Sequence, residues 1–541
     1  MKLMKRCFLV LIALVWFIII APYFVAQTTY GARYVSQLFT YLHPDYTITV
    51  GKLSHSFANP YEITLQQLEI KDKHQNKTYL STKKLVLGLS KNHPLQFETF
   101  RYAIVENGSV TLSSPISQTA INLLQLNNVD LYYHNANENL DIKLHHVQGG
   151  LNTQPNQHHQ LKFTAQQASY NDLNIYSLSV NGSQDHEALT LNQISGNINQ
   201  GFFSGRTIIY QNDSLNIGEL KINKINLQSQ INQLDINELF DYIPRLTIQR
   251  LSVVNSSIDL PELMLEKGNL EASNLQYYNQ RWQLERSELT FNAQSIVWQD
   301  ELIEQPLLQW HNNDQQLIVD QILAKWNKGT IYATGALQNN QFTVNKLFIT
   351  GLHYLLPENW LEKINTINLP DAFPQITIQQ WTLLPSIIVD TNADFPFEFT
   401  LFEGMGNNLI LRKEQNKTQI IGKLTLKAES ATLNSVKLQQ PDLAITLSPQ
   451  SNHFQFSSMV DQGIIEGEAT LVPTTNSAQF AMQSYFVNSQ VLKQWQLVDN
   501  PNVTNKFSLS LNGTIQPLQL NGWLTSGQNR YPVKNQHKVI H

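Results

Sequence analysis

Cysteine and charge are scarce in this sequence of 541 residues. The only cysteine is Cys7, which excludes an internal disulfide bond. Charged residues make up 15% of the chain, the formal net charge is −5, and there is no basic run. This composition indicates neither nucleic acid nor an anionic membrane surface as a partner.

The common catalytic and phosphate-binding motifs are also missing, namely Gly-x-Ser-x-Gly, His-Glu-x-x-His and Gly-x-x-x-x-Gly-Lys. Two histidine pairs, 145–146 and 158–159, are predicted to be solvated loop residues, because neighbouring residues on a strand point to opposite faces and cannot share a metal. Gly404-Met-Gly406 resembles half of a dinucleotide fingerprint, but the third glycine is missing, and we expect a turn. We therefore expect no enzyme activity, no cofactor and no metal site.

Apolar residues, in contrast, are plentiful at 42% of the chain, which argues against disorder. The length exceeds what one hydrophobic core usually supports. One stretch recurs: the pattern of residues 189–201 returns at 317–329 (329 − 201 = 128), and a shorter copy runs over 454–463. Each copy has an apolar strand, a polar turn ending in glycine, and a second strand. Such repetition indicates an elongated array of units rather than one compact core.

Residues 7–26, from Cys7 to Ala26, form an uninterrupted apolar stretch of about the ~20 residues that cross a bilayer as a helix. A cleaved signal peptide would have a shorter apolar region and small residues at a cleavage site, which are missing here. We therefore expect a transmembrane anchor. Basic residues precede it and place residues 1–6 in the cytoplasm, with the chain from residue 27 outside: Lys2, Lys5 and Arg6.

The stretch that follows the anchor, 28–42, has a helical apolar stripe: Tyr30, Tyr34, Leu38 and Leu42. Two interpretations are open. The stripe could face the core as a cap on the first strands, which we favour, or the helix could lie at the membrane surface.

From Asp45 the apolar residues alternate with polar ones in short runs separated by Asn-Gly and Gly-Gly turns, which predicts antiparallel strands. Helices are expected only at 234–242 and 357–364. Little helix is left to cover the apolar side of so much sheet. The sheet could curl around an open trough, or two sheets could stack into a dry sandwich, and periodicity does not separate these alternatives.

Glycines inside predicted strands bear on curvature, because a missing side chain there usually marks a bulge, a bend or the close approach of another group. Gly335, Gly422 and Gly467 are such positions. At the C-terminal end, the polar residues 527–541 are expected to be a disordered tail.

Four blocks of sequence resemble the AsmA family of Gram-negative envelope proteins: residues 27–32, 46–57, 349–360 and 394–409. The later two, with Leu-Pro-x-Asn-Trp and Asp-Phe-Pro, are the more specific. The resemblance implies an inner-membrane protein whose periplasmic part, residues 27–526, is a β-sheet rolled into an apolar groove with no catalytic residues. It also favours the open trough over the dry sandwich.

The resemblance implies that the groove binds phospholipid acyl chains and helps to move phospholipid between the inner and outer membranes. Apolar positions on predicted strands are the candidates for the groove lining: Leu317, Val319, Leu424, Leu426, Phe454 and Phe456. A protein partner at the outer membrane or in the periplasm is expected. The alternative function is a non-enzymatic scaffold for outer-membrane protein assembly, which would offer an unpaired strand edge.

Overall fold

The computed structural model describes residues 14–15, 17, 20–21, 23–74, 77–89, 100–112, 121–135, 140–153, 158–170, 173–185, 187–198, 200–228, 244–261, 263–279, 281–283, 286–298, 301–313, 316–338, 341–360, 369, 374–414, 417–495, 497–498, 503, 505–516 and 518–534. The fold is mainly β, as the alternation predicted. Contacts between Cα atoms divide the chain into unit 1, residues 1–256 and 276–282, and unit 2, residues 257–275 and 283–541.

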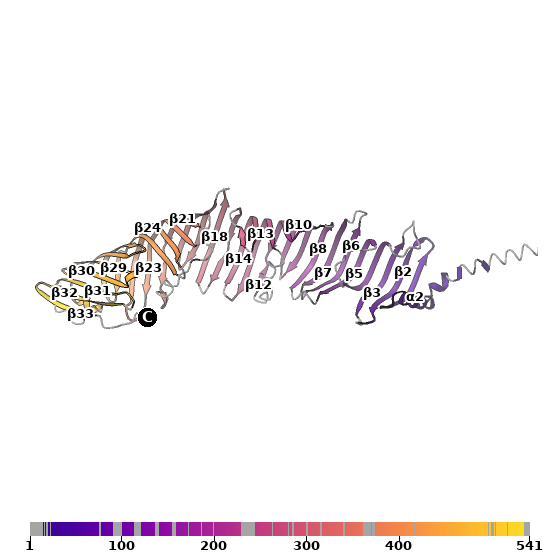
Figure 1. Cartoon of the computed structure of the whole chain (residues 1–541), viewed down its shortest axis with the longest axis horizontal. Helices are drawn as coiled ribbons and strands as arrows, with labels where there is room; N and C mark the ends of the chain where they lie inside the picture. The colour runs from indigo at the N-terminus through magenta and orange to yellow at the C-terminus, as the bar shows by residue number, and fades with distance from the viewer. Residues whose placement is uncertain are drawn as a thin grey trace, which may run out of the picture. The chain divides into compact units, whose positions relative to one another are not determined.

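Unit 1 contains a helix and a series of strands that lie side by side in chain order (Figure 1). The elements are α2 (Thr29–Leu42), β1 (Tyr46–Ser56), β2 (Asn59–Asp72), β3 (Thr78–Leu89), β4 (Phe100–Leu112), β5 (Ile121–Asn135), β6 (Leu140–Thr153), β7 (His159–Tyr170), β8 (Leu173–Gln184), β9 (Ala188–Ile198), β10 (Gly201–Gln211), β11 (Ser214–Asn223), β12 (Asn226–Gln228) and β13 (Arg245–Leu260), whose end belongs to unit 2. From β1 to β11 each strand pairs with the next, antiparallel except for the parallel pair β4 and β5, and β11 pairs in parallel with β13.

Unit 2 is built in the same way. Its elements are β14 (Leu263–Tyr278) and β15 (Arg281–Gln283), which cross the boundary, β16 (Glu288–Asn292), β17 (Ser295–Trp298), β18 (Glu301–Asn312), β19 (Leu317–Trp326), β20 (Gly329–Gln338), β21 (Gln341–Thr350), β22 (His353–Leu355), β23 (Gln375–Asp390), β24 (Phe397–Glu414), β25 (Lys417–Lys427), β26 (Ser430–Leu433), β27 (Val436–Leu447), β28 (Asn452–Val460), β29 (Gly463–Val472), the 3-10 helix η2 (Pro473–Thr475), β30 (Ser477–Tyr485), α5 (Gln490–Gln494), β31 (Lys506–Thr514), β32 (Gln519–Ser526) and β33 (Asn529–Lys534). The described strands of unit 2 pair antiparallel, except that β21 and β22 run parallel to β23.

The repeat of 128 residues is a repeat of structure. In the first copy β9, β10 and β11 form an antiparallel meander, and β11 then pairs in parallel with β13. In the second, β19, β20 and β21 form the meander, and β21 pairs in parallel with β23. Each parallel junction carries a buried serine whose hydroxyl accepts a backbone N–H, at 3.3 Å from Ile225 to Ser256 and at 3.2 Å from Leu352 to Ser386. The first two copies of the sequence repeat therefore share their strand pairing, whereas the third, shorter copy is followed by the antiparallel pair β30 and β31.

A line of polar residues bends the strands of unit 1. Leu65 and Leu68 of β2 are both buried, although residues three apart on a regular strand point to opposite faces. Gln67 between them has φ +51°, a left-handed conformation that kinks the strand, although the pairing of β2 with β1 and β3 keeps the same register on both sides of it. Asn107 and Asn128 repeat this conformation on β4 and β5, and the Asn128 side-chain amide donates to Asn107 Oδ1 at 2.7 Å. Because these exposed residues lie side by side, the sheet curls toward its other face.

Some local predictions were wrong. The pair His145-His146 lies in β6 and not in a loop, and His146 is one of the bend residues, with φ +53°. Gly404 and Gly406 lie in β24 and not in a turn. The Trp381 ring on β23 occupies the space that a Cβ at either position would need, which explains the two glycines. The expected tail is ordered at its start, since residues 529–534 form β33 and Val533 is buried.

The glycine prediction is confirmed, whereas most of the two expected helices lies outside the described residues. Gly422 has φ +143°, whereas Gly467 makes room for the Phe456 ring and Gly335 lies against the β21 backbone, so glycines mark both a bulge and close approaches. The helix expected at 234–242 lies outside the described residues, as does 361–364 of the helix expected at 357–364. At its start, the Trp360 N–H donates to Pro357 O at 3.0 Å.

Candidate functional site

The inner face of unit 1 is covered by apolar side chains in two adjacent cross-strand rows. The first row runs Leu53, Leu65, Leu85, Val105, Leu126, Gly149, Phe163, Val180, Ile194, Gly205, Leu220 and Leu251. The second runs Ile63, Leu87, Ala103, Leu124, Leu151, Leu161, Gly182, Leu191, Ile208, Ile217 and Ile248. Neither row contains a charged or hydrogen-bonding side chain.

Burial differs along this inner face. The side chains next to the bend are buried and form a floor, for example Leu126, Val129 and Val147. Those farther from the bend, such as Leu161 and Phe163, pack against the floor but keep part of their surface exposed. The curled sheet therefore offers an apolar floor with partly exposed apolar walls, a surface that can take up more apolar material.

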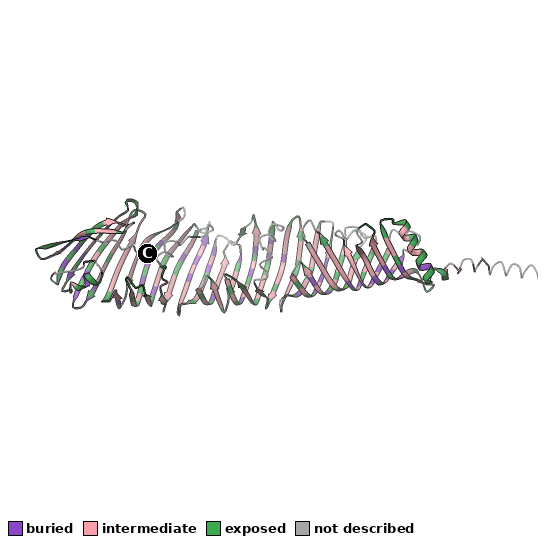
Figure 2. Ribbon diagram, turned by 90° about the horizontal axis from the view of Figure 1, so that it is seen from below, coloured by how far each residue is buried: buried purple, intermediate pink, exposed green. Residues whose placement is uncertain are grey.

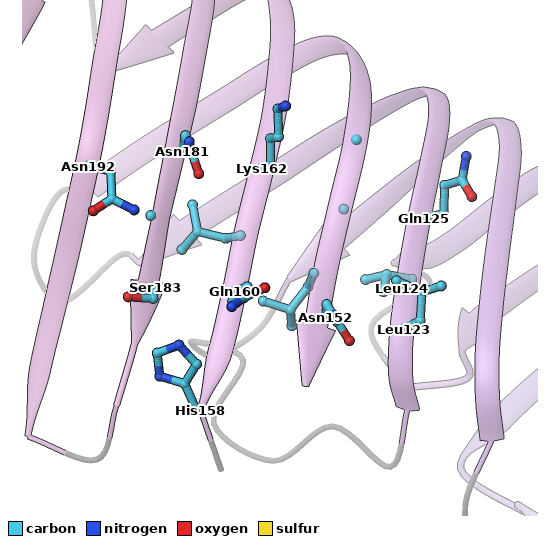
Figure 3. A pocket seen from close by; sticks show the side chains of 15 residues that line it. Leu123, Leu124, Gln125, Asn152, His158, Gln160, Lys162, Asn181, Ser183 and Asn192 are labelled. Carbon is cyan, nitrogen blue, oxygen red and sulfur yellow. The ribbon is translucent and has the colours of Figure 1, made fainter. Parts of the chain in front are cut away.

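A cavity of about 600 Å³ lies on strands β5 to β9 of unit 1 (Figure 3). It forms where Gly149, Gly150 and Gly182 leave the sheet without side chains. Its other lining residues are partly aliphatic and partly polar: Leu123, Leu124, Gln125, Leu151, Asn152, His158, Gln160, Leu161, Lys162, Asn181, Ser183 and Asn192. His158 and Lys162 are the ionisable residues among them.

The six groove-lining positions predicted from the sequence all lie in unit 2. Leu424 and Phe454 lie in one cross-strand row on a single face of the sheet from β25 to β31, with Ile445, Ala469, Phe480 and Leu511. Leu426 and Phe456 lie in the next row of the same face, with Leu443, Gly467, Met482 and Leu509. The structure thus brings these four predicted residues together.

Leu317 and Val319 lie elsewhere in unit 2, on β19, and other side chains of the protein cover them. Their side chains are 3% and 5% exposed. They pack against Leu337 and against partly buried Trp310 and Phe342 of the neighbouring strands. These two residues belong to a closed apolar cluster and offer almost no surface to a ligand.

The C-terminal part of unit 2 is also closed. The connection between β30 and β31 carries α5 and lays Val487, Val491 and Leu492 on the apolar face, where all three are buried. Phe456 packs against this cluster and stacks on Phe480, with ring centroids 6.1 Å apart. The dry interior that the periodicity left open is therefore realised around α5. Leu424, Leu426 and Phe454 keep part of their surface exposed, as do the apolar walls of unit 1, where no candidate had been predicted.

Helix α2 covers the edge strand of unit 1 with its polar side. The Val50 N–H donates to Ser36 Oγ at 2.8 Å, and the Ile48 N–H donates to Thr40 Oγ1 at 3.1 Å. These hydroxyls satisfy backbone donors that an edge strand would otherwise present to another chain. The stripe predicted to face the core points away from it: Tyr30, Tyr34, Leu38 and Leu42 are exposed. The helix is a cap, but the predicted orientation was wrong.

Two tyrosines on the sheet have raised pKa values, and each lies beside a carboxylate. Burial, together with a hydrogen bond of 2.8 Å to Glu62, raises the pKa of Tyr102. Burial and the nearby Asp130 carboxylate likewise raise the pKa of Tyr132. Among the described residues, no group of three or more His, Cys, Asp or Glu side chains is placed to hold a metal ion.

The N-terminal apolar stretch is described only in part. Cys7 lies outside the described residues, whereas Ala26 ends a helical run, Tyr23–Ala26. No helix in the described part of the chain has both the length and the apolar character needed to cross a membrane. The anchor over residues 7–26 stays a prediction.

These features define a class: mainly β proteins whose curled sheets carry rows of apolar side chains on the inner face. Within that class the chain is similar to an AsmA family protein, as the sequence blocks predicted. It is 24% identical over 532 residues to the AsmA family protein YicH of Escherichia coli (strain K12), a match that covers 95% of this chain and 92% of that protein. No protein-family model matches the chain.

Proposed function

We propose that the inner face of unit 1 binds the acyl chains of phospholipids, and that the protein thereby helps to move phospholipid between the inner and outer membranes. Residues 7–26 would anchor the chain in the inner membrane and leave the sheet in the periplasm. The proposed role is non-enzymatic and needs no cofactor. The similarity to an AsmA family protein is consistent with a place in the cell envelope.

The observation that carries the proposal is the pair of uncharged, apolar rows across unit 1. Transfer of a methylene from water to an apolar surface is worth roughly 0.8 kcal/mol, so an acyl chain gains from each partly exposed wall residue that it covers. Because the rows have no polar side chain to fix a headgroup, the acyl chain can shift along them from strand to strand. A surface of this kind suits lipid passage better than tight binding of one lipid species.

Two residues of β7 provide a matched test. Leu161 lies in the second apolar row, between Leu151 and Gly182, whereas Thr164 is exposed on the opposite face of the same strand and does not line the cavity. We expect Leu161→Asp to lower the uptake of fluorescent phospholipid from vesicles by the purified full-length protein, because the carboxylate must be desolvated beside an acyl chain. Thr164→Asp adds the same charge on the opposite face and should leave uptake unchanged.

The comparison is valid where circular dichroism and thermal unfolding show that both variants fold. Equal uptake by the two folded variants, or no uptake by the unaltered protein, would exclude the proposal. The same transfer measured between labelled and unlabelled vesicles distinguishes a protein that only holds lipid from one that moves it.

A second candidate function is a scaffold for outer-membrane protein assembly, and one observation favours it. Among the described strands, none pairs with the outer side of β33, so this edge could add a strand from another chain. Pro532 has no N–H to donate, which weakens such pairing. Crosslinks from β33 to assembly proteins, together with normal function of the Leu161→Asp variant, would support the scaffold over the lipid-binding role.

A further inference from the structure

The outward face of α2 is aromatic and aliphatic, whereas its protein-facing side combines the hydroxyls of Ser36 and Thr40 with the half-buried Val35 and Phe39. Figure 2 shows this helix mostly in the colour of exposed residues. Tyr34 and Tyr41 are 71% and 84% exposed, and Tyr30, Leu38 and Leu42 share their face. A helix packed on a sheet normally presents polar side chains on its outward face. The outward face of α2 is therefore suited to an apolar or interfacial environment rather than to water.

A tight turn ties α2 to the end of the predicted anchor. The Thr28 N–H donates to Val25 O at 3.0 Å, and its hydroxyl donates to the same oxygen at 2.6 Å. Thr28 then caps α2, since Thr28 Oγ1 accepts the Gly31 N–H at 3.3 Å. A Cβ at Gly31 would overlap Val25 O and the Ala26 backbone. The helix cannot move far from residues 23–26.

Further aromatic residues lie beside the same turn. The Tyr23 hydroxyl donates to His55 O at 2.7 Å, and the Tyr23 ring lies 4.5 Å from the ring of Phe57, centroid to centroid. Phe57, at the tip of the β1–β2 hairpin, is exposed, and so is Phe24. Together with α2 these residues form an aromatic belt next to the apolar stretch. Tyrosine rings of this kind gather at membrane interfaces, where the ring is apolar and the hydroxyl reaches water.

We propose that α2 lies in the headgroup region of the bilayer that holds the anchor, with its Tyr and Leu face inserted and the edge strand β1 held next to the lipid surface. The inference rests on the anchor in the proposed function. Charge is compatible with it, because α2 has no acidic residue and its one charged side chain is Arg33. A lipid surface fits better than a protein partner because the turn at Thr28 places α2 directly where the apolar stretch ends.

Site-specific fluorescence tests the proposal on the full-length chain. Cys7→Ser removes the native thiol, and single cysteines then carry the polarity-sensitive dye NBD. Leu38→Cys reports the outward face of α2. Leu302→Cys of β18 is the matched control, because the two leucines are 47% and 50% exposed. Phe17→Cys reports insertion of the anchor itself. The protein is reconstituted into phosphatidylethanolamine and phosphatidylglycerol vesicles, with and without doxyl-labelled lipid.

We expect doxyl lipid to quench the labels at Leu38 and Phe17 but not the label at Leu302. In the same vesicles iodide should quench the label at Leu38 several-fold less than the label at Leu302. Quenching at Phe17 but not at Leu38 would overturn the inference and leave the anchor intact. Loss of quenching at both positions would overturn the inference and the anchor together, whereas lipid uptake by unit 1 is measured separately. Iodide protection at Leu38 without doxyl quenching would indicate a protein contact and would also overturn it.

Discussion

The closed end of unit 2 makes a quantitative prediction about Leu492. This side chain is 0% exposed and lies with Val487 and Val491 against Leu509 of β31. Leu492→Ala removes most of a fully buried side chain and leaves a cavity, which costs about 2–5 kcal/mol in well-packed cores. For a loss of about 3 kcal/mol, amide protection that depends on opening of this region should fall roughly 150-fold.

Hydrogen–deuterium exchange with mass spectrometry measures this effect strand by strand. Peptides of β31 and β32 should exchange faster in the Leu492→Ala variant, whereas peptides of β5 to β8 in unit 1 serve as an internal reference and should not change. The neighbouring Lys493 is exposed on α5, so Lys493→Ala should leave protection within about 0.5 kcal/mol of the unaltered protein. Equal protection in the two variants would mean that α5 does not seal this face, and the closed end would have to be abandoned.

Three further predictions concern unit 1. Ser36→Ala leaves the Val50 N–H without its acceptor, so the protein should lose about 1 kcal/mol of stability and associate more at the exposed edge, measured by light scattering during size-exclusion chromatography. Unchanged mass and stability would argue against the cap. Gln67→Val should cost more than about 1 kcal/mol in chemical unfolding because φ is +51°, while Gln67→Gly should be tolerated, and the reverse order would contradict the bend. The pKa of Tyr102 is raised above its ordinary 10.0, so its stabilising contribution should hold below pH 10 and disappear as pH rises through the folded value; Tyr102→Phe should remove that part of the alkaline slope.

The strands and the repeat could be predicted because alternation and self-similarity are local properties of the chain. The bends had a local signal as well, which the interpretation missed. At Gln66-Gln67 and Asn127-Asn128 two polar residues interrupt the alternation, so that apolar residues three apart, such as Leu65 and Leu68, reach the same face. Doubled polar residues inside an alternating run are the local sign of this bend.

The orientation of α2 and the closure of unit 2 depend on distant partners. Periodicity finds the stripe of Tyr30 and Tyr34, but it does not show that Ser36 and Thr40 are needed against the edge of β1. In the same way, no local pattern predicts that α5 packs on the apolar face of the sheet from which it extends. Leu317 and Val319 were predicted to line the groove because they are apolar residues on a strand. Residues of a sealed cluster and residues of an open wall share this property, so the sequence does not distinguish them.

Photo-crosslinking in living cells tests the central claim most directly. The photoreactive amino acid p-benzoylphenylalanine replaces Phe163, which lies in the first apolar row of unit 1, or Thr164, which is exposed on the opposite face of β7. After irradiation, mass spectrometry of the purified chain should find a phospholipid adduct at position 163 and none at position 164. No adduct at position 163, or equal adducts at both positions, would contradict a lipid-binding inner face.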